Sequence, residues 1–494
     1  MEKYILKQNK TDKIFLFIII SVGVFFRLFH LSVRSFWCDE FLAIFLGSKP
    51  FPWMINYITF HDAHPPLFYF IVGLFLKYGK SEFFLRLLPV FFGVLCIPFS
   101  YILGKEIFGR KEGILLASIL SLNPAHILWS QILKSYTLFT FLLIISFYFF
   151  YKLIFYEQKK KLWIGLFFIN VCILYLHNLG FITLLIQFFF LLLRKKLNKK
   201  WFFYYMFIFF SYLPWLSRIP CQLSFTLGIR RPIPLFYKFI YHFFYFFLGE
   251  TINPFYFVIV IPAFLVFSFF LLSGLSNLFN IKNEKNFLVL LGIFVPLFFI
   301  PFPSTIPQNL IPYSIFWYIL LTLGIKKMKN VFFIFFIIPF FLFSVFFYYT
   351  ENVFHYHDIS KLVPYREIGK FLSDITGKND IILITEKREF IFGKDFSAFD
   401  WYYKGEAKVI DITEEKIDFN NISKLLENYK YFWLFLNLNQ YYELSCKLKV
   451  YFDKNYKKIW EEKYLWNERI LQRLKKNKGK DRYYNFIEIY LYKR

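Results

Sequence analysis

The sequence predicts an α-helical polytopic membrane protein of about eleven spans, followed by a small extracytoplasmic α/β domain. Hydrophobic residues make up 57% of its 494 residues and aromatic residues 25%, more than in ordinary soluble proteins. Apolar runs of about 16–22 residues, each long enough to cross a bilayer, recur between short polar loops as far as residue 350. From residue 351 the composition becomes charged and mixed. We therefore expect residues 1–350 to form a membrane domain and residues 351–494 a separate domain.

The charge distribution predicts how the chain is oriented. Of its 59 Lys and Arg residues, 32 lie in residues 1–350, together with only 11 of its 33 Asp and Glu residues. An excess of Lys and Arg marks the cytoplasmic loops of membrane proteins. We therefore expect a cytoplasmic N-terminus, an external first loop over residues 32–85 and an extracytoplasmic C-terminal domain, in the cytoplasmic (inner) membrane. Because the basic residues cluster between spans, the net charge of +26 does not indicate a nucleic-acid partner.

The positions of the spans follow from the apolar runs. The first span is expected at about residues 14–31, and the external loop after it contains the short apolar run 67–76. This run follows Pro65-Pro66 and predicts an interfacial helix rather than a span. A second interfacial segment is expected at 236–249, because it contains Lys238. The other spans are expected at about 86–103, 113–129, 137–156, 162–176, 180–193, 201–216, 256–273, 287–302, 310–325 and 331–349.

The C-terminal domain alternates predicted helices and strands, as α/β domains do. Residues 365–376 have helical periodicity, whereas 380–385, 431–438 and 485–492 have the composition of strands. No glycine-rich phosphate loop, zinc motif or nucleophile elbow is recognisable there. The five cysteines of the chain show no spacing typical of a metal site or a disulfide framework.

Acidic residues are scarce in the membrane domain, so their positions are informative. The residues expected to be external are Asp39, Glu40, Asp62, Glu82 and Glu250, and all but the last lie in the first loop. The adjacent carboxylates Asp39 and Glu40 suit a general base. The alternative is that both residues only cap the start of an interfacial helix. The acidic residues expected to be cytoplasmic, and solvated, are Glu2, Asp12, Glu106, Glu112, Glu157 and Glu284.

A histidine and two prolines follow Asp62 in the same loop. Paired prolines stiffen the start of a helix, and a lone histidine such as His64 is commonly a hydrogen-bonded structural residue. Asp62 and His64 could also contribute to a divalent metal site. Two ligands do not define such a site, so the residues leave the metal open.

Cationic side chains are expected at the same external face. These residues are Arg86, Lys134, Arg230 and Arg231. Each of them could simply extend to lipid headgroups. Together with the carboxylates they could instead form a site for sugar transfer from a lipid phosphate. In such a reaction one carboxylate deprotonates the acceptor hydroxyl and the cations stabilise the departing phosphate, so no general acid is required.

Several motifs in this order resemble a known family. Asp39-Glu40, followed by Asp62-x-His64-Pro65-Pro66-Leu67, is similar to the pattern of the protein O-mannosyltransferases and their bacterial relatives. Those relatives include the aminoarabinose transferases of the ArnT-like branch, within the GT-C superfamily. The similarity covers roughly residues 14–345 and is densest over 34–140. Further matching segments are Leu85 to Pro89, 104–113, 124–136, His177-Asn178-x-Gly180, Pro214-Trp215-Leu216 and Ile311-Pro312.

The resemblance implies the GT-C fold and a donor in which a sugar is carried on a polyprenyl phosphate. It implies transfer with inversion, Asp39 as the catalytic base and Glu40 shaping the acceptor or donor site beside it. Arg86 and Lys134 would contact the lipid phosphate. The residues that would complete the substrate site are Asp62, His64, Tyr136 and the family landmark His177.

The chain departs from the family pattern in two places. Bacterial relatives usually read Ser-Gln-Glu-Ala-Arg-x-Tyr in the second external loop, whereas this chain has Ile132 for the Glu and Lys134 for the Arg. Lysine keeps a point charge but lacks the bidentate fork of arginine. Gln308-Asn309 stands where relatives often have Arg-Tyr, so the way the donor phosphate is held stays open. Arg230 or Arg231 could compensate for the missing cation.

These observations predict an integral membrane glycosyltransferase that moves a hexose or pentose from a polyprenyl phosphate to a protein, lipid or glycan of the cell envelope. A glycan polymerase or ligase with a diphosphate-linked donor is the alternative enzyme. A lipid flippase or transporter would instead place carboxylates within spans or show inverted repeats, and neither is evident. An inactive relative is the remaining alternative, because of the changes at Ile132 and Gln308.

Overall fold

The computed structural model describes residues 2–156, 158–229, 234–249, 252, 257–302, 305–328, 333–350, 364–385, 389–391, 394–413, 419–437, 442–465 and 485–494. The chain divides into two compact units. The helical unit comprises Met1–Leu31 and Ala43–Phe354, and the α/β unit comprises Ser32–Leu42 and His355–Arg494. The eleven residues Ser32–Leu42 therefore group with the C-terminal part of the chain, although they lie near its start.

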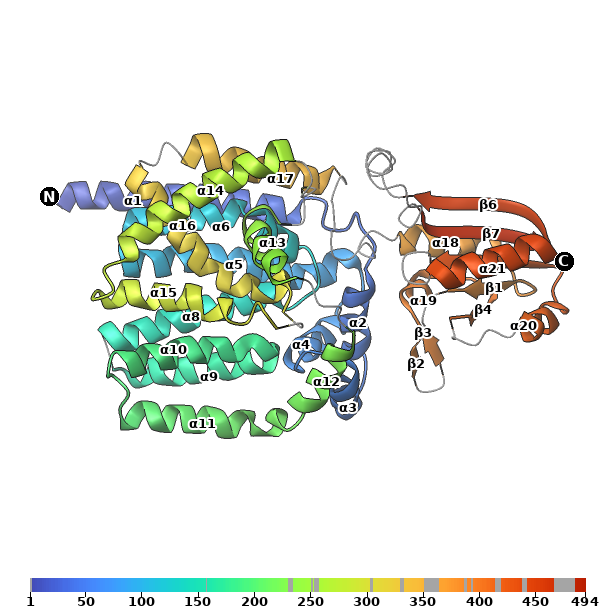
Figure 1. The fold of residues 1–494 in the computed structure, drawn as a ribbon, viewed down its shortest axis with the longest axis horizontal. Helices are drawn as coiled ribbons and strands as arrows, with labels where there is room; N and C mark the ends of the chain where they lie inside the picture. Colours follow the sequence, from blue (N-terminus) through green and yellow to red (C-terminus); the bar gives the residue numbers. More distant parts are fainter. Residues whose placement is uncertain are drawn as a thin grey trace. The chain divides into compact units, whose positions relative to one another are not determined.

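Long helices that run side by side make up the helical unit (Figure 1). Every predicted span overlaps one of them, and the prediction of a helical membrane protein with a small C-terminal sheet is confirmed. The helices at the predicted spans are α1 (Glu2–Leu28), α5 (Glu82–Phe108), α6 (Arg110–Leu122) with α7 (Pro124–Ser130), α8 (Tyr136–Phe155), α9 (Lys160–Leu176), α10 (Phe181–Leu193), α11 (Lys199–Leu216), α14 (Phe257–Leu278), α15 (Glu284–Leu297), α16 (Ser314–Met328) and α17 (Ile338–Tyr349).

The number of spans is a separate question from the number of helices. Within the described residues, four helical segments are singly long and apolar enough to cross a membrane: α5, α8, α14 and Pro307–Met328, which joins the short helix η2 (Pro307–Tyr313) to α16. Helices α6 and α7 bend by 59° at their junction and could together form a fifth. The remaining helices are shorter or more polar, so about eleven spans stays a prediction.

Helix starts in this unit are marked by side-chain caps. The Ser81 hydroxyl accepts a hydrogen bond from the Phe84 amide at 3.2 Å and begins α5. The Asn123 side chain accepts from the His126 amide at 2.9 Å and begins α7, with Pro124 in the first position of that helix. Asparagine and serine side chains accept hydrogen bonds from the free backbone amides at helix starts. Proline is tolerated at the first helical position, because the N–H that it lacks has no partner in the helix there. The bend between α6 and α7 is therefore encoded locally.

Two kinds of contact hold the membrane helices together. Small residues let backbones approach: a β-carbon on Gly324 of α16 would collide with the Phe270 carbonyl of α14. Polar side chains also bond across helices. The Asn170 amide of α9 donates to Gln187 at 2.8 Å and to the Tyr204 hydroxyl at 2.7 Å, which links α9 to α10 and α11. Such bonds satisfy polar groups that lipid cannot.

Ion pairs tie the helices together at the end of the unit where the N-terminus lies. Lys152 Nζ lies 2.9 Å from Glu106, and Lys196 Nζ lies 2.6 Å from Glu284. The other pairs there are Asp12 with Arg110 and Glu112 with Lys326. The expectation that these carboxylates are only solvated is therefore wrong for Asp12, Glu106, Glu112 and Glu284, because each one faces a cation from another segment. Glu157 lies outside the described residues.

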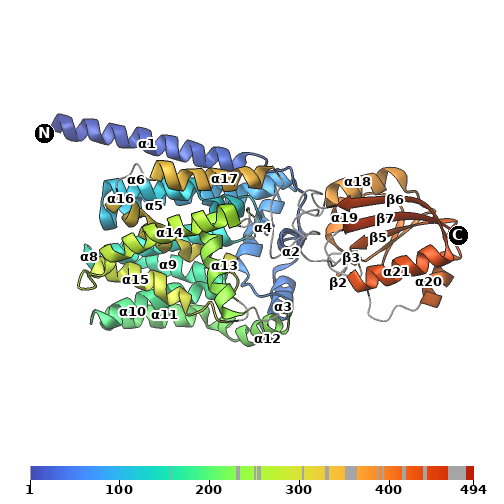
Figure 2. The same ribbon diagram turned by 45° about the horizontal axis from the view of Figure 1, so that its top comes forward.

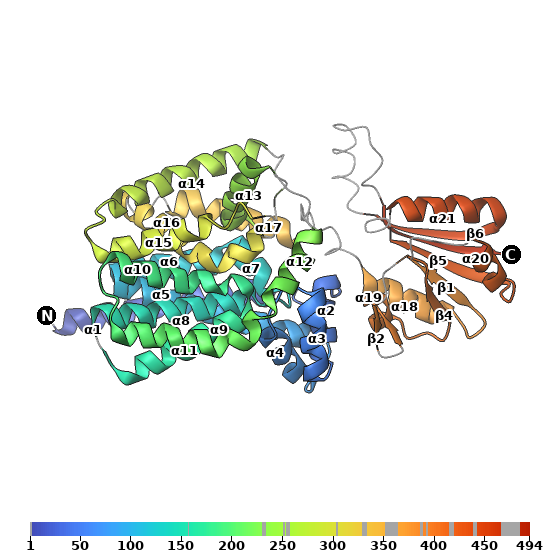
Figure 3. The same cartoon turned by 60° about the horizontal axis from the view of Figure 1, so that its bottom comes forward.

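Short helices gather at the other end of the helical unit, where α3 (Phe51–His61), α4 (Leu67–Leu76) and α12 (Ile219–Ile229) lie near one another (Figures 1 and 3). The predicted interfacial helix coincides with α4, and the other predicted interfacial segment coincides with α13 (Leu235–Leu248). Helix α17 runs beside α1 (Figure 2), and the Tyr349 hydroxyl donates to the Phe26 carbonyl. The candidate site residues Asp62, His64 and His177 come from turns at this end.

The α/β unit contains a five-stranded sheet in the order β4-β1-β5-β7-β6. Strands β1 (Ile381–Ile384), β4 (Lys408–Asp411) and β5 (Tyr431–Asn437) are parallel, whereas β6 (Lys457–Leu465) and β7 (Asn485–Lys493) pair antiparallel. All three predicted strands and the predicted helix are present, the helix as α18 (Tyr365–Ile375). The other elements are β2 (Glu389–Ile391), β3 (Lys394–Phe396), α19 (Ala398–Tyr402), α20 (Phe419–Leu426) and α21 (Tyr442–Asn455).

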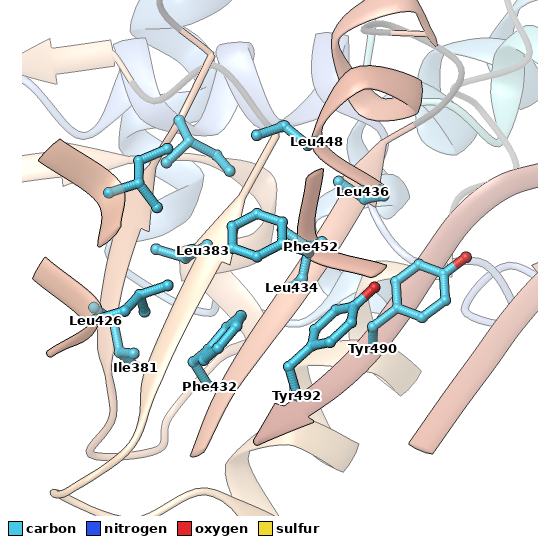
Figure 4. Close-up of a cluster of buried hydrophobic side chains, with 12 residues drawn as sticks. Ile381, Leu383, Leu426, Phe432, Leu434, Leu436, Leu448, Phe452, Tyr490 and Tyr492 are labelled. Atoms are coloured by element: carbon cyan, nitrogen blue, oxygen red, sulfur yellow. The ribbon is translucent and has the colours of Figure 1, made fainter. Parts of the chain in front are cut away.

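An apolar core holds the α/β unit together (Figure 4). Leu383, Phe432 and Leu434 of the central strands face Phe452 of α21 and Tyr492 of the last strand, and all five side chains are fully buried. The rings of Phe432 and Tyr492 stack at 5.5 Å. The aromatic and β-branched composition of these strands explains their formation. This core cluster lies between the sheet and α20 and α21, whereas α18 and α19 contact the sheet through other side chains, including Phe371 with Trp433 and Phe399 with Phe435.

Candidate active site

The turn between α3 and α4 carries Asp62 and His64. Asp62 Oδ1 lies 3.1 Å from His64 Nδ1 and accepts a hydrogen bond from the Ala63 amide at 2.6 Å, while its Oδ2 accepts from the Tyr69 hydroxyl. Asp62 is only 6% exposed. A carboxylate removed from water to this degree needs such donors, because burial without them is costly. Asp62 and His64, predicted from their spacing, therefore form a hydrogen-bonded pair.

Two amide side chains from other segments hold this turn. The Asn178 side chain donates to the Ala63 carbonyl at 2.9 Å and to Gln222 Oε1, also at 2.9 Å. Gln222 of α12 in turn donates to the His64 carbonyl at 3.1 Å and to the Ile58 carbonyl at 3.0 Å. The polar backbone of the turn is thus bonded to α12 and to the segment after α9, which makes the position of the Asp62–His64 pair rigid.

His177, between α9 and the short helix η1 (Asn178–Gly180), packs against His64. The two rings meet edge to face with centroids 5.1 Å apart, and the His177 ring stacks on Phe139 at 5.8 Å. His177 Nδ1 accepts from the Leu179 amide at 3.0 Å, which assigns the proton to Nε2. Burial, with the nearby His64 and Lys134, lowers the pKa of His177 well below 6.5, so the ring is neutral at neutral pH. Asn309 comes close, but among the described residues this buried Nε2 has no hydrogen bond of normal geometry.

Lys134 reaches the same place from the loop between α7 and α8, and Tyr136 from the first turn of α8. Lys134 is only 6% exposed, and its charge acts on both Asp62 and His177. The Tyr136 hydroxyl donates to Asn309 Oδ1 of η2 at 3.2 Å. The structure therefore brings together, from three segments of the chain, the predicted site residues Asp62, His64, Lys134, Tyr136 and His177.

The charges around Asp62 predict how the fold responds to acid. Burial raises the pKa of Asp62, but His64, Lys134 and the Tyr69 hydroxyl outweigh it and bring the pKa below its ordinary value of 3.8. A carboxylate with a lowered pKa stabilises the fold above its unfolded-state pKa, and this contribution disappears as the pH falls through the folded-state value. We expect Asp62→Asn to cost about 1–3 kcal/mol at pH 7 and much less near pH 3.

Thermal unfolding of the purified protein in detergent between pH 3 and pH 7 measures this effect. Glu82→Gln, at the start of α5, serves as the control variant. A stability difference between Asp62→Asn and the wild type that is constant across this pH range would contradict the assignment, because the Asp62 contribution would then not depend on its ionisation.

The loop that carries Lys134 is anchored by a buried arginine that no motif pointed to. Arg27, near the end of α1, is fully buried, and each of its N–H groups is bonded. Its partners, all at 3.0–3.1 Å, are Gly23 O, Leu120 O, Ser121 O, Ser130 Oγ and His126 Nδ1. Two of these are carbonyls from the last turn of α6, where a helix favours a positive charge. Arg27 therefore closes the end of α6 and joins it to α7.

Gln131 adds a second anchor at the start of the same loop. Its amide donates to the carbonyls of Phe26 and Arg27 at 3.1 Å and of Phe29 at 2.7 Å. These carbonyls lie in and just after the last turn of α1. Carbonyls at the end of a helix lack the backbone N–H partner that carbonyls in earlier turns have. The end of α7 and the first residue after it are therefore both bonded to α1, which fixes the start of the loop that carries Lys134.

Arg86, in the first half of α5, lies at the junction between α1 and the segment after it. Its guanidinium donates to the Leu31 carbonyl at 3.0 Å, and the residue is 4% exposed. The predicted contact of Arg86 with a lipid phosphate is untested and stays a prediction. In this structure Arg86 holds the backbone immediately before Ser32, where the α/β unit's segment begins.

Asp39 and Glu40 lie in the first turn of α2 (Cys38–Gly47), in the segment that belongs to the α/β unit. Glu40 is 1% exposed, and its Oε2 accepts from the Trp37 amide at 3.3 Å. A glutamate three residues into a helix that bonds back to the amide before it is half of a capping box. Glu40 thus caps the start of α2, as the alternative interpretation of the carboxylate pair expected. Asp39 is partly exposed, and it lies in the first turn of the helix, where a negative charge is favoured.

The structure does not test two points of the sequence analysis, the arginines at 230–231 and the open question of a metal. Arg230, Arg231 and Glu250 lie outside the described residues. Among those described, no group of three or more His, Cys, Asp and Glu side chains could hold a metal ion, so Asp62 and His64 gain no further ligand of these types.

Comparisons with known proteins bear on this arrangement. Residues 63–217 match the family model described as dolichyl-phosphate-mannose-protein mannosyltransferase. The structure is similar to ArnT of Cupriavidus metallidurans in the apo state, with a TM-score of 0.59 over 96% of this chain and 97% of that chain at 10% identity. ArnT bound to undecaprenyl phosphate gives a TM-score of 0.57 at 11% identity, with the same coverage of both chains.

The chain has the GT-C fold.

The similarity extends to a second GT-C glycosyltransferase, the archaeal oligosaccharyltransferase AglB of Archaeoglobus fulgidus in complex with an inhibitory peptide and a dolichol-phosphate. The TM-score is 0.52 at 10% identity, over 87% of this chain and 70% of that chain. No curated protein sequence matches the chain. At these identities the structural likeness establishes the GT-C fold, and it leaves the roles of individual residues to the geometry described above.

The GT-C motifs did not reveal several residues that shape the site. Arg27 looked like one more basic residue near a span end, and Gln222 lies outside the matching segments. Asn178 belongs to the segment His177-Asn178-x-Gly180, but its partners could not be read from that motif. A charged side chain within the last turns of the first apolar run was the available signal for Arg27, because such a residue is expensive in a membrane unless it is bonded. For Gln222 no signal was available, since it donates to the backbone carbonyls of Ile58 and His64, which are distant in the sequence.

Proposed function

We propose that this GT-C protein transfers a sugar from a polyprenyl phosphate to a hydroxyl group of a cell-envelope protein, lipid or glycan, with inversion. The observation that carries the proposal is the buried Lys134 ammonium beside Asp62 and His177, at an end of the membrane helices. Lys134, His64 and His177 lie inside the segment that matches the mannosyltransferase family model. A lipid-linked phosphate can reach such a cation from the membrane.

Two groups in the cluster suit an anionic, hydroxyl-rich ligand. The Lys134 ammonium can neutralise charge on a phosphate oxygen, with a strength that burial increases. The neutral His177 ring keeps a buried Nε2–H donor available, and a buried donor of this kind commonly awaits a ligand or water. ArnT of Cupriavidus metallidurans has been crystallised with undecaprenyl phosphate, and AglB with a dolichol-phosphate, which supports a lipid-phosphate ligand for this chain as well.

The reaction needs one base and one leaving group. In the proposed mechanism the Asp39 carboxylate removes the proton of the acceptor hydroxyl as its oxygen attacks the anomeric carbon. The bond between that carbon and the phosphate oxygen breaks on the opposite face, which inverts the configuration. The bonding electrons leave with the polyprenyl phosphate, and Lys134 stabilises the charge that develops on it. A divalent cation that assists the leaving group stays an open part of the proposal.

The proposal includes an orientation in the cytoplasmic (inner) membrane. The N-terminus would be cytoplasmic, and the first loop and the C-terminal domain would face the periplasm or the cell exterior. The basic residues at the opposite end of the helical unit from Asp62, including Lys152, Lys196 and Lys326, support this orientation.

Release of polyprenyl phosphate from radiolabelled polyprenyl-phosphate sugars tests the proposal. Membranes that contain the protein are incubated with each common hexose and pentose donor, and a crude envelope extract supplies the acceptor. Membranes with an unrelated membrane protein give the background. We expect release above background with at least one donor and label in the acceptor fraction. Background release with every donor would overturn the proposed transferase activity.

Lys134 provides a second prediction for this activity. We expect Lys134→Met to raise the KM for the lipid donor and lower kcat, with a loss in kcat/KM of about 10²–10³-fold, because the phosphate loses a buried positive charge. Lys134→Arg keeps the charge, and most relatives carry Arg there, so it should retain activity. An unchanged kcat/KM in Lys134→Met would remove Lys134 from the donor site.

A further inference from the structure

We infer that the α/β unit is a positioning device for the catalytic carboxylate, and that Arg366, Trp401 and Tyr402 are the positioning residues. The inference rests on the proposed function, since it assigns Asp39 the role of base. Its starting point is the division of the chain: Ser32–Leu42, which carries Asp39, groups with His355–Arg494 in one compact unit. The contacts come from α18 and α19, which also pack against the sheet through ring contacts such as Phe399 with Phe435 at 5.3 Å.

Arg366 of α18 holds the beginning of the segment by its backbone. Its guanidinium donates to the Ser32 carbonyl at 2.9 Å and to the Val33 carbonyl at 2.7 Å. Glu367 accepts from the same guanidinium at 2.9 Å and 3.2 Å, which fixes its plane. A planar group with several fixed donors sets direction as well as distance. The chain that leads to Asp39 is thus held at two consecutive residues.

Tyr402 of α19 holds the segment closer to the carboxylates. Its hydroxyl accepts a hydrogen bond from the Phe36 amide at 2.8 Å, between residues 366 positions apart in the chain. Phe36 is fully buried, so this amide has little access to water as an alternative partner. The bond fixes the backbone three residues before Asp39.

Trp401 contacts both sides of Asp39 in the sequence. Its ring meets Phe36 edge to face at 6.5 Å and Phe41 at 6.0 Å. Glu40 closes the first turn of α2 through its bond to the Trp37 amide, as described above. Asp39 lies between these fixed points, so the direction of its side chain follows from contacts that the α/β unit supplies. A base must lie within about 3 Å of the proton that it removes, and small displacements of it are costly in rate.

A positioning role predicts a loss in kcat with little change in donor affinity. We expect Tyr402→Phe to lower kcat about tenfold, because one buried hydrogen bond of the segment is lost, and to leave the KM for the lipid donor within about twofold. Tyr403→Phe is the matched control, because it makes the same change at the next residue. The Tyr403 hydroxyl bonds Thr376 at 2.8 Å and the Ala407 amide at 2.9 Å, both within the C-terminal part of the unit, so kcat should be retained.

Hydrogen–deuterium exchange of the full-length protein gives a readout that needs no activity. In Tyr402→Phe the amides of residues 34–42 should exchange about five- to tenfold faster than in wild type, whereas strands β1 and β5 should exchange as before. In Tyr403→Phe the segment should exchange as in wild type. Trp401→Ala should act like Tyr402→Phe and more strongly, and Trp401→Phe should recover part of the loss because it keeps a ring.

Several results would overturn the inference. One is unchanged exchange of residues 34–42 in both Tyr402→Phe and Trp401→Ala. Another is an equal loss of kcat in Tyr402→Phe and Tyr403→Phe, which would mean that the unit matters only for stability. A wild type that releases no polyprenyl phosphate from any donor would instead refute the proposed function, and the exchange measurement would still decide whether the α/β unit holds the segment.

Discussion

Asp39→Asn is expected to lower the rate of sugar transfer about 10²–10⁴-fold, the range associated with loss of a general base. The amide has nearly the same shape as the carboxylate but cannot accept the proton of the acceptor hydroxyl. Because Asp39 is partly exposed in the first turn of α2, the change should leave the fold and the binding of the lipid donor almost unaffected. The expected signature is therefore a low kcat with a KM close to that of wild type.

The measurement is donor-dependent release of polyprenyl phosphate by membranes with equal amounts of folded protein. Glu40→Gln is the matched control, because it makes the same chemical change at the next residue. The structure gives Glu40 a capping bond to the Trp37 amide, which an amide oxygen can still accept. We expect Glu40→Gln to lose less activity than Asp39→Asn. If Glu40→Gln were the more damaged variant, the role of base would pass to Glu40.

Arg27→Met should produce the largest loss of stability, about 3–5 kcal/mol. Methionine fills a similar volume, but it removes the side-chain donors to the carbonyls of Leu120 and Ser121 at the end of α6, and to the Gly23 carbonyl and the Ser130 hydroxyl. All of these are buried where neither water nor lipid can replace the lost donors. Because Arg27 also joins α6 to α7, the loop that carries Lys134 should lose its position together with the stability.

Thermal unfolding and the yield of folded protein in detergent measure this prediction. Arg110→Met is the matched control, since Arg110 also links α6 to α1, through Asp12, but is partly exposed. A pair of that kind contributes about 0–1 kcal/mol. Arg27→Lys should lie between the two, because it keeps the charge but has fewer and less directed donors. Equal stability of Arg27→Met and Arg110→Met would contradict the assigned role of Arg27.

Local patterns predicted much of this molecule. The apolar runs located the helices, since membrane helices satisfy their backbone internally and need only length and apolar composition. The strands 380–385, 431–438 and 485–492 were found for a related reason, because their composition suits a buried sheet. The two-residue spacing of Asp62 and His64 indicated only that both could contribute to one metal site, and the hydrogen bond between them is a finding of the structure.

Contacts between distant segments could not be predicted in the same way. The pairing of the Tyr136 hydroxyl with Asn309 joins residues 173 positions apart, and nothing local to either residue indicates it. The cytoplasmic carboxylates were expected to be solvated because their loops look polar. In the fold, each described one except Glu2, whose side chain is not described, meets a cation from another helix, which a reading of single loops does not reveal. The grouping of Ser32–Leu42 with the C-terminal residues is of the same kind.

That grouping limits how this chain can be recombined. A C-terminal α/β domain that follows a membrane domain looks like a module that could be exchanged between relatives at one junction near residue 351. Here the module has a second, remote part, because eleven residues before Ala43 pack with it. A chimera that replaces only the C-terminal part would pair a foreign surface with the native Ser32–Leu42. A working chimera should therefore exchange Ser32–Leu42 together with the C-terminal domain, and we expect relatives to inherit the two segments as one discontinuous unit.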